Sequence, residues 1–295
     1  MKKLSAFCLT MIFISFAFTH EEQSVVPPKI IFAVLDDGQS VEPIAKVKEG
    51  KLLPAVGGGD AGDTLLDFDA LYYQPKASYR LIYGGKENGK VSVVKSFVGT
   101  ECGGATAQVI TTSQKVKLKG FEMALATNIR TTKPAAGVRK APSVAERAAI
   151  EKLVIKEFKK NNVLVKGMKL VKLTSIDADN NKVNEIVGTY TVAPSAKERA
   201  LLFFIATRSK VGGYSINYSV CDKIKEDGVM SGDIKDVDGG IYQELLLDIL
   251  DFDDNGIAEL FTITQAFEGT NFNAYQWDGK KWEKILEVSN YHCGY

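Results

Sequence analysis

Oxygen-bearing side chains stand at alternate positions in one short stretch of this sequence, residues 251–259, which reads Asp-Phe-Asp-Asp-Asn-Gly-Ile-Ala-Glu. Asp251, Asp253 and Asn255 can converge on one ion if the chain curls, and Gly256 permits a sharp turn. The Ile257 carbonyl and Glu259 would complete the set. Calcium takes about six to eight hard oxygen ligands at about 2.3–2.6 Å. We therefore predict a calcium site in this stretch.

A second stretch, beginning at Asp177, repeats this spacing. Two copies of a nine-residue pattern are much less expected by chance than one, which strengthens the calcium prediction. The earlier copy differs where Lys182 replaces the glycine. A lysine adopts a left-handed backbone at a cost and brings a positive charge to a cation site. We expect this loop to bind calcium weakly or not at all.

Neither loop fits an EF-hand, which needs an acidic ligand at its twelfth position and a helix on each side. The twelfth positions are Thr262 and Gly188, and the flanking residues are strand-like. Across residues 167–290 the chain instead resembles FG-GAP repeats, the β-propeller-type repeats of integrin α chains. That resemblance implies calcium ligands at the first, third, fifth and ninth residues and at the seventh carbonyl. Here these are Asp251, Asp253, Asn255, Ile257 and Glu259, and likewise Asp177, Asp179, Asn181, Val183 and Glu185. The alternative is that both are plain Asp/Asn-rich hairpin turns.

Residues 1–19 have the features of a signal peptide, so we expect an exported protein, periplasmic or extracellular. Lys2 and Lys3 give a positive start, and the apolar run from Leu4 to Phe18 is too short to span a membrane comfortably. An uncleaved anchor is the alternative. No later stretch is apolar enough to cross a bilayer. Export suits calcium, because sites with dissociation constants of about 10⁻⁴–10⁻³ M fill outside cells.

Charge is distributed unevenly along a chain whose net charge is only +1. Residues 130–172 hold twelve Lys or Arg against three Glu, and residues 222–259 hold twelve Asp or Glu against three Lys. Phe158 is the single aromatic residue of the basic part, so aromatic interleaving does not support nucleic-acid binding and we predict no nucleic-acid partner. A solvated helix face and an acidic calcium region explain the asymmetry.

The hydrophobic pattern predicts a mainly β protein with one amphipathic helix. Residues 20–131 form an N-terminal antiparallel β domain, in which the period is two from Tyr79 onward and the segments 79–83 and 90–98 predict a β-hairpin. Residues 132–166 contain a linker and a helix. Ser143 and Glu146 form a capping box at the start of this helix. Residues 167–295 form two repeats of four antiparallel strands, a propeller-blade pattern. Two blades cannot close a ring, so the helix, the N-terminal domain or self-association must cover the sheet edges.

Three cysteines remain after the signal peptide, namely Cys102, Cys221 and Cys293. An exported chain permits disulfides. Cys221 and Cys293 each follow the last strand of a repeat, which favours a bridge between these two. The alternative is that none is paired.

The sequence has few of the residues and motifs that familiar hydrolases use. It has two histidines, and it lacks both a Gly-x-Ser-x-Gly elbow and a His-Glu-x-x-His motif. We therefore expect a non-enzymatic binding or structural module with an unknown protein or glycan partner. The alternative is a secreted, carboxylate-based hydrolase, carbohydrate-active enzymes included, with calcium as a structural ion. Trp277 and Trp282 offer a sugar platform or, more commonly, a core pair across a hairpin.

Overall fold

The computed structural model describes residues 27–56, 62–113, 115–133, 138–209 and 212–293, and it confirms a mainly β protein. The predicted signal peptide and most of the glycine-rich segment 57–63 lie outside the described residues. In the described part of the chain, no helix is long and apolar enough to span a membrane.

The strands group into one N-terminal set and two later sets of four. The first set is β1 (Lys29–Leu35), β2 (Ser40–Lys48), β3 (Lys51–Pro54), β4 (Ser78–Tyr83), β5 (Lys86–Ser96), β6 (Ala107–Thr112) and β7 (Ala124–Thr127). The second is β8 (Lys169–Ile176), β9 (Glu185–Ser195), β10 (Glu198–Arg208) and β11 (Tyr214–Lys225). The third is β12 (Glu244–Leu250), β13 (Glu259–Gln265), β14 (Gly269–Trp277) and β15 (Trp282–Tyr291). The helices are α1 (Gly62–Tyr72), α2 (Val144–Lys160) and α3 (Lys235–Gly239), with single 3₁₀ turns at Asp36–Gly38 and Glu226–Gly228.

The N-terminal strands close into a barrel. Their order is β1-β7-β4-β5-β6-β2-β3, and β1 also pairs with β2, which completes a ring of six antiparallel strands with β3 added outside it. The predicted hairpin is confirmed as the β4–β5 pair. Closure removes the free edges that an open sheet of this kind would expose.

Alternate residues of β1 face opposite sides of the barrel wall, as the pleat of a strand requires. Ile30, Phe32 and Val34 lie in the barrel core, where Phe68 of α1 packs 6.2 Å from the Phe32 ring, measured between centroids. Ile31 and Ala33 face outward into a second cluster shared with β12–β15. Both faces of β1 are therefore buried.

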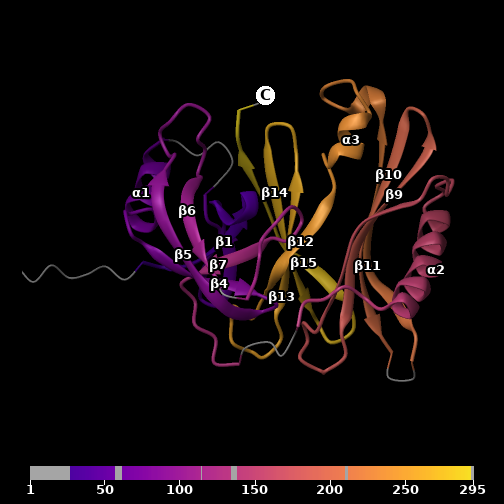
Figure 1. Ribbon diagram of the computed structural model, residues 1–295, viewed down its shortest axis with the longest axis horizontal. Coiled ribbons are helices and arrows are strands. Elements are labelled where there is room, and N and C mark those ends of the chain that lie inside the picture. The colour runs from indigo at the N-terminus through magenta and orange to yellow at the C-terminus, as the bar shows by residue number, and fades with distance from the viewer. Residues whose placement is uncertain (1–26, 57–61, 114, 134–137, 210–211, 294–295) are drawn as a thin grey trace, which may run out of the picture.

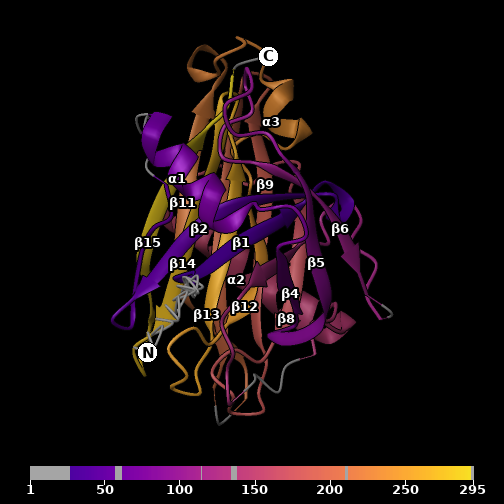
Figure 2. The same ribbon diagram turned by 90° about the vertical axis from the view of Figure 1, so that its left-hand side faces the viewer.

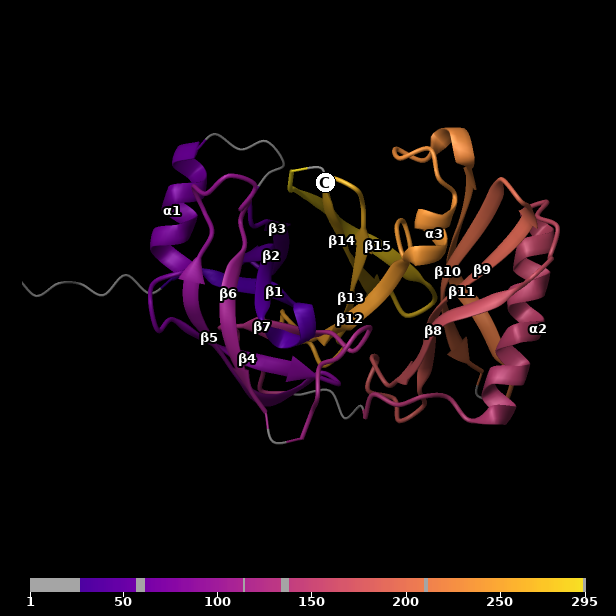
Figure 3. The same cartoon turned by 45° about the horizontal axis from the view of Figure 1, so that its top comes forward.

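The two later sets are separate four-stranded antiparallel sheets, as the sequence predicts; we call β8–β11 repeat sheet 1 and β12–β15 repeat sheet 2. Repeat sheet 2 lies between its neighbours, since its apolar residues share one cluster with the barrel and another with repeat sheet 1. Figures 1 and 3 show the barrel, repeat sheet 2 and repeat sheet 1 as successive layers. In Figure 2, β1 and β2 lie in front of repeat sheet 2.

Helix α2 covers the remaining face of repeat sheet 1. The predicted capping box is present, since Ser143 accepts from the amide of Glu146 and the Glu146 carboxylate accepts from the amide of Ser143. Its apolar stripe of Ile150, Val154 and Phe158 is fully buried against that sheet. The barrel and α2 thus cover the outer faces of the two-sheet stack, as Figure 1 shows.

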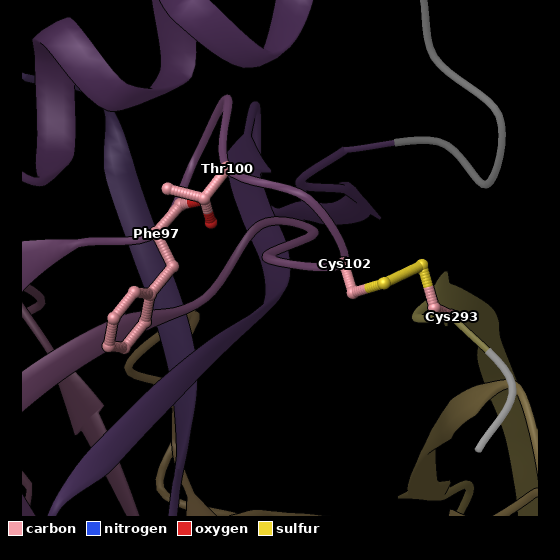
Figure 4. The surroundings of a disulfide bond; sticks show 4 residues. All are labelled: Phe97, Thr100, Cys102 and Cys293. Atoms are coloured by element: carbon pink, nitrogen blue, oxygen red, sulfur yellow. A yellow bond between two sulfur atoms is a disulfide. The ribbon is translucent and has the colours of Figure 1, made fainter.

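The cysteine pairing expected from the sequence is wrong. Cys102, in the loop between β5 and β6, is bonded to Cys293 after β15, and Cys221 is a free, half-buried thiol. Figure 4 shows the bond bridging the barrel loop that carries Phe97 and Thr100 to the C-terminal segment. Cys221 lies within β11 and packs against the apolar cluster under α2. The position of a cysteine near the end of a repeat therefore did not predict its disulfide partner.

Two helices were not predicted. Helix α1 packs its aromatic residues Phe68 and Tyr72 into the barrel core. Helix α3 is only five residues long and contributes Val237 to a small cluster beside repeat sheet 1. Trp277 and Trp282 form a core pair, with ring centroids 5.6 Å apart.

Candidate metal centre

The two acidic loops occupy equivalent places in the repeats. The loop at Asp177 joins β8 to β9, and the loop at Asp251 joins β12 to β13. Each begins directly after a strand that is buried at its end, which fixes the direction in which the first aspartate leaves the sheet. Asp177 and Asp251 are both 4% exposed, so each first residue points into the protein.

The acids of each loop converge. Carboxylate oxygens of Asp251, Asp253 and Glu259 all lie within 4.8 Å of one another, and those of Asp177, Asp179 and Glu185 do the same. Two oxygens bound at about 2.4 Å to one ion can be at most about 4.8 Å apart. Each loop therefore brings three predicted ligands within the span of a single calcium coordination sphere.

Backbone amides hold the acids of the Asp251 loop in this arrangement. The Asn255 amide donates to Asp251 Oδ1 at 3.0 Å and to Asp253 Oδ1 at 3.2 Å. Gly256 donates to Asp251 Oδ2 at 2.8 Å, and Ile257 donates to Asn255 Oδ1 at 2.7 Å. The chain has curled around its own carboxylates, as the alternate spacing predicts.

The Asp177 loop has the same hydrogen bonds, one for one. Asn181 donates to Asp177 Oδ1 at 3.1 Å and to Asp179 Oδ1 at 3.2 Å, and Val183 donates to Asn181 Oδ1 at 2.7 Å. Lys182 donates to Asp177 Oδ2 at 3.0 Å, in the place of Gly256. The ligand roles of the Ile257 and Val183 carbonyls stay predictions.

Lys182 adopts the backbone that the glycine would have adopted. Its φ is +70°, against +96° for Gly256, so both lie in the left-handed region. For a residue with a Cβ this conformation costs about 1–2 kcal/mol. The Lys182 side chain is exposed, which leaves the oxygen cluster to the acids. The substitution thus strains the loop without changing its shape.

Burial makes these carboxylates hard to ionise. Removal from water raises the pKa of Glu185 to about 8, although the Ala178 amide opposes the shift. Burial likewise raises the pKa of Glu259 to about 8, against a hydrogen bond from Gln276. Desolvation also raises the pKa of Asp179 and of Asp251. A divalent cation among these oxygens would reverse the effect, because opposite charge favours the ionised form.

The chemistry of the donor set fits a hard cation. The clustered atoms are carboxylate oxygens, with amide oxygens of Asn255 and Asn181 on the same turns. No Lys or Arg forms an ion pair with these acids among the described residues. Zinc prefers nitrogen and sulfur ligands, whereas calcium is bound by oxygen alone.

Sequence reasoning missed Asp254, the one acid of its loop assigned no ligand role. Its carboxylate leaves the loop and accepts from the Thr132 amide at 2.7 Å, the Thr132 hydroxyl at 2.5 Å and the Lys133 amide at 3.2 Å. These bonds anchor the segment after β7 to the Asp251 loop. The contact spans 122 residues of sequence, so local spacing carried no signal of it.

A second missed group is Asp248, which interrupts the apolar run of β12. It is fully buried, and its two oxygens accept from the Gly84 amide at 3.0 and 2.8 Å. Burial raises its pKa to about 7, while Arg139 opposes the shift. An aspartate within Leu-Leu-Leu-Asp-Ile-Leu was the available signal that this strand meets a polar partner.

Comparison with known proteins gives no match, whether with family models, curated proteins or solved structures. The resemblance to FG-GAP repeats therefore rests on the two loops and their flanking strands.

Proposed function

We propose that this chain is an exported calcium-binding β-repeat protein that acts as a non-enzymatic binding or structural module. The single observation that carries the proposal is the convergence of three acids in each loop within 4.8 Å. The shared hydrogen-bond frame supports it, because the Asp177 loop keeps the curled shape of the Asp251 loop despite Lys182.

The ligand sets of the two loops suit calcium better than magnesium. Magnesium demands near-ideal octahedral geometry at about 2.0–2.1 Å and keeps several waters, whereas calcium accepts a larger and more irregular oxygen shell. Each loop provides three clustered acids, and the predicted ligands of each loop add an asparagine oxygen and a main-chain carbonyl. Such a set suits the larger ion.

In this proposal the ion ties strand ends together. It would link the end of β12 to the start of β13 through Asp251 and Glu259, and β8 to β9 through Asp177 and Glu185. Repeat sheet 2 is the central layer, so its loop supports both neighbours. Calcium would therefore stabilise the whole stack and leave its surfaces free to bind a partner.

Thermal unfolding of the mature chain in calcium and in chelator tests the proposal. If calcium binds only the folded protein, ligand at about 100 times its dissociation constant adds about 2.7 kcal/mol to the free energy of unfolding. Asp251→Asn with Asp253→Asn should abolish most of this gain and still fold without metal. Asp67→Asn with Glu49→Gln removes two exposed acids elsewhere and should keep the gain. A melting temperature indifferent to calcium and chelator would contradict the proposal.

A further inference from the structure

A cavity of about 650 Å³ lies where the barrel, the segment after β7 and repeat sheet 2 meet. Small-molecule sites commonly have volumes of about 300–1,000 Å³ and favour the junctions between domains. Its walls come from β4, the β4–β5 turn, residues 129–131 and the end of β12. It is separate from the oxygen clusters described above, since none of their acids lines it.

The cavity has an apolar floor. Ile82, Ile129 and Leu250 line it, and all three are buried in the cluster between the barrel and repeat sheet 2. Their exposed fractions are 5%, 3% and 1%. Only small parts of these three side chains face the cavity, so they offer the apolar body of a ligand a narrow contact.

The rim carries three cations and one acid. Arg80 is held in place by a bond of 2.6 Å from its guanidinium to the Ile129 carbonyl, and Glu87 lies 3.3 Å from it. Lys86 and Arg130 are exposed and form no ion pair with any described residue. The Glu87 carboxylate is 60% exposed, so solvent weakens its pairing with Arg80. The rim therefore presents excess positive charge with unused donors.

One wall of the cavity is attached to the Asp251 loop. Arg130 and Thr131 line the cavity, and the next two residues are bound by Asp254. Leu250 of the floor also lines the cavity, and it directly precedes Asp251. An ion that orders this loop would order two walls of the cavity, and linkage makes such coupling reciprocal.

We propose that this cavity binds a small organic anion with an apolar body, and that calcium in the Asp251 loop strengthens that binding. The floor takes the apolar body, and Arg80, Lys86 and Arg130 take the anionic group. The site itself stands on the cavity and its lining, whereas the calcium dependence rests on the proposed function.

Fluorescence titration of the mature chain tests the anion site. The probes are 8-anilinonaphthalene-1-sulfonate, an aromatic sulfonate, and N-phenyl-1-naphthylamine, which has the same aromatic body without the charge. Lys86→Gln with Arg130→Gln should weaken sulfonate binding about tenfold and leave the uncharged probe within twofold. Lys159→Gln with Lys235→Gln, which removes two charges away from the cavity, should change neither. Equal sulfonate affinity in the wild type and the rim variant, or equal loss for both probes, would overturn the site.

A second titration tests the calcium dependence of sulfonate binding. Saturating calcium should tighten sulfonate binding at least threefold relative to chelator in the wild type. Asp254→Ala cuts the bond to the cavity wall and should remove this response, while calcium still raises the melting temperature. A calcium response that survives in Asp254→Ala would overturn the coupling. A melting temperature indifferent to calcium, with the rim variant still defective in sulfonate binding, would overturn the proposed function and leave the anion site standing.

Discussion

Ala178 and Ala258 join the two acidic loops, since the amide of Ala258 donates to the carbonyl of Ala178 at 2.8 Å. The amide of Ala178 in turn donates to Glu185 Oε2 at 2.9 Å, and Ala258 directly precedes Glu259. Both alanines are buried in the cluster between the two repeat sheets. A short path of main-chain groups therefore connects the ninth-position carboxylates of the two loops.

This contact predicts that the loops bind calcium cooperatively. Asp177→Asn with Asp179→Asn should disable the first loop and weaken calcium binding in the second about fivefold, within the usual 1–3 kcal/mol of coupling between sites. Calorimetric titration measures the calcium affinity of the intact loop. Asp67→Asn with Glu49→Gln serves as the control of equal charge. Unchanged affinity in the intact loop would show that the hydrogen bond carries no coupling.

The raised pKa values predict how the metal-free protein responds to pH. The folded pKa of Glu185 and of Glu259 is about 8, above the ordinary value of 4.5, so burial favours the neutral acids. Their contribution to stability is full below about pH 4.5 and is lost as pH rises through about 8. In chelator, the contribution of these two glutamates should therefore lower the melting temperature as pH rises from about 4.5 to about 8.

Glu185→Gln with Glu259→Gln isolates this effect, because glutamine keeps the shape without titrating. The slope of melting temperature against pH should flatten in this variant. Asp248, with a pKa of about 7, and Asp179 and Asp251, whose pKa values are also raised, contribute with the same sign to the slope that remains. Identical slopes in the wild type and the variant would contradict the assignment to these two glutamates.

Arg139 is predicted to hold the layers together. Its side chain is 2% exposed and donates to the carbonyls of Met123 at 3.0 Å and Leu247 at 2.5 Å, joining the barrel to repeat sheet 2. Arg139→Met leaves those carbonyls and the nearby acids without their donor, so we expect a loss of about 2–4 kcal/mol in unfolding free energy. Urea denaturation measures it. Arg147→Met, at an exposed pair, should cost about 0.5 kcal/mol or less; equal losses would contradict the role of Arg139.

The disulfide is predicted to stabilise the contact between the barrel and the C-terminal segment. Cys102 and Cys293 are separated by 191 residues, and closing so long a loop restricts the unfolded chain strongly. Cys102→Ser with Cys293→Ser should lower the unfolding free energy by about 2–4 kcal/mol. Cys221→Ser should have little effect. Peptide mapping without reductant should recover the Cys102–Cys293 peptide, and a bridge containing Cys221 would contradict the structure.

Local rules were enough to predict much of this fold. The capping box at Ser143, the apolar stripe of α2, the β4–β5 hairpin and the strands beside both loops depend on neighbours a few residues apart. The convergence of Asp251, Asp253 and Glu259 also follows from spacing within one turn.

The remaining features depend on contacts between distant residues. Barrel closure pairs β1 with β7, whose partners Ile31 and Thr127 lie far apart in sequence, and α1 places Phe68 and Tyr72 in the barrel core. The same applies to the Cys102–Cys293 bond and to the attachment of Asp254 to Thr132. Periodicity does not encode such partners, because each side of the contact satisfies its local pattern in many arrangements.

The number of calcium ions bound per chain tests the central claim most directly. Titration calorimetry on the chelator-treated chain without residues 1–19 should give one ion in the Asp251 loop and a second, weaker one in the Asp177 loop, and only the weaker one after Asp251→Asn with Asp253→Asn. If the wild-type chain binds no calcium at millimolar concentration, the two loops are acidic turns and the account of this protein as a calcium-binding repeat protein is contradicted.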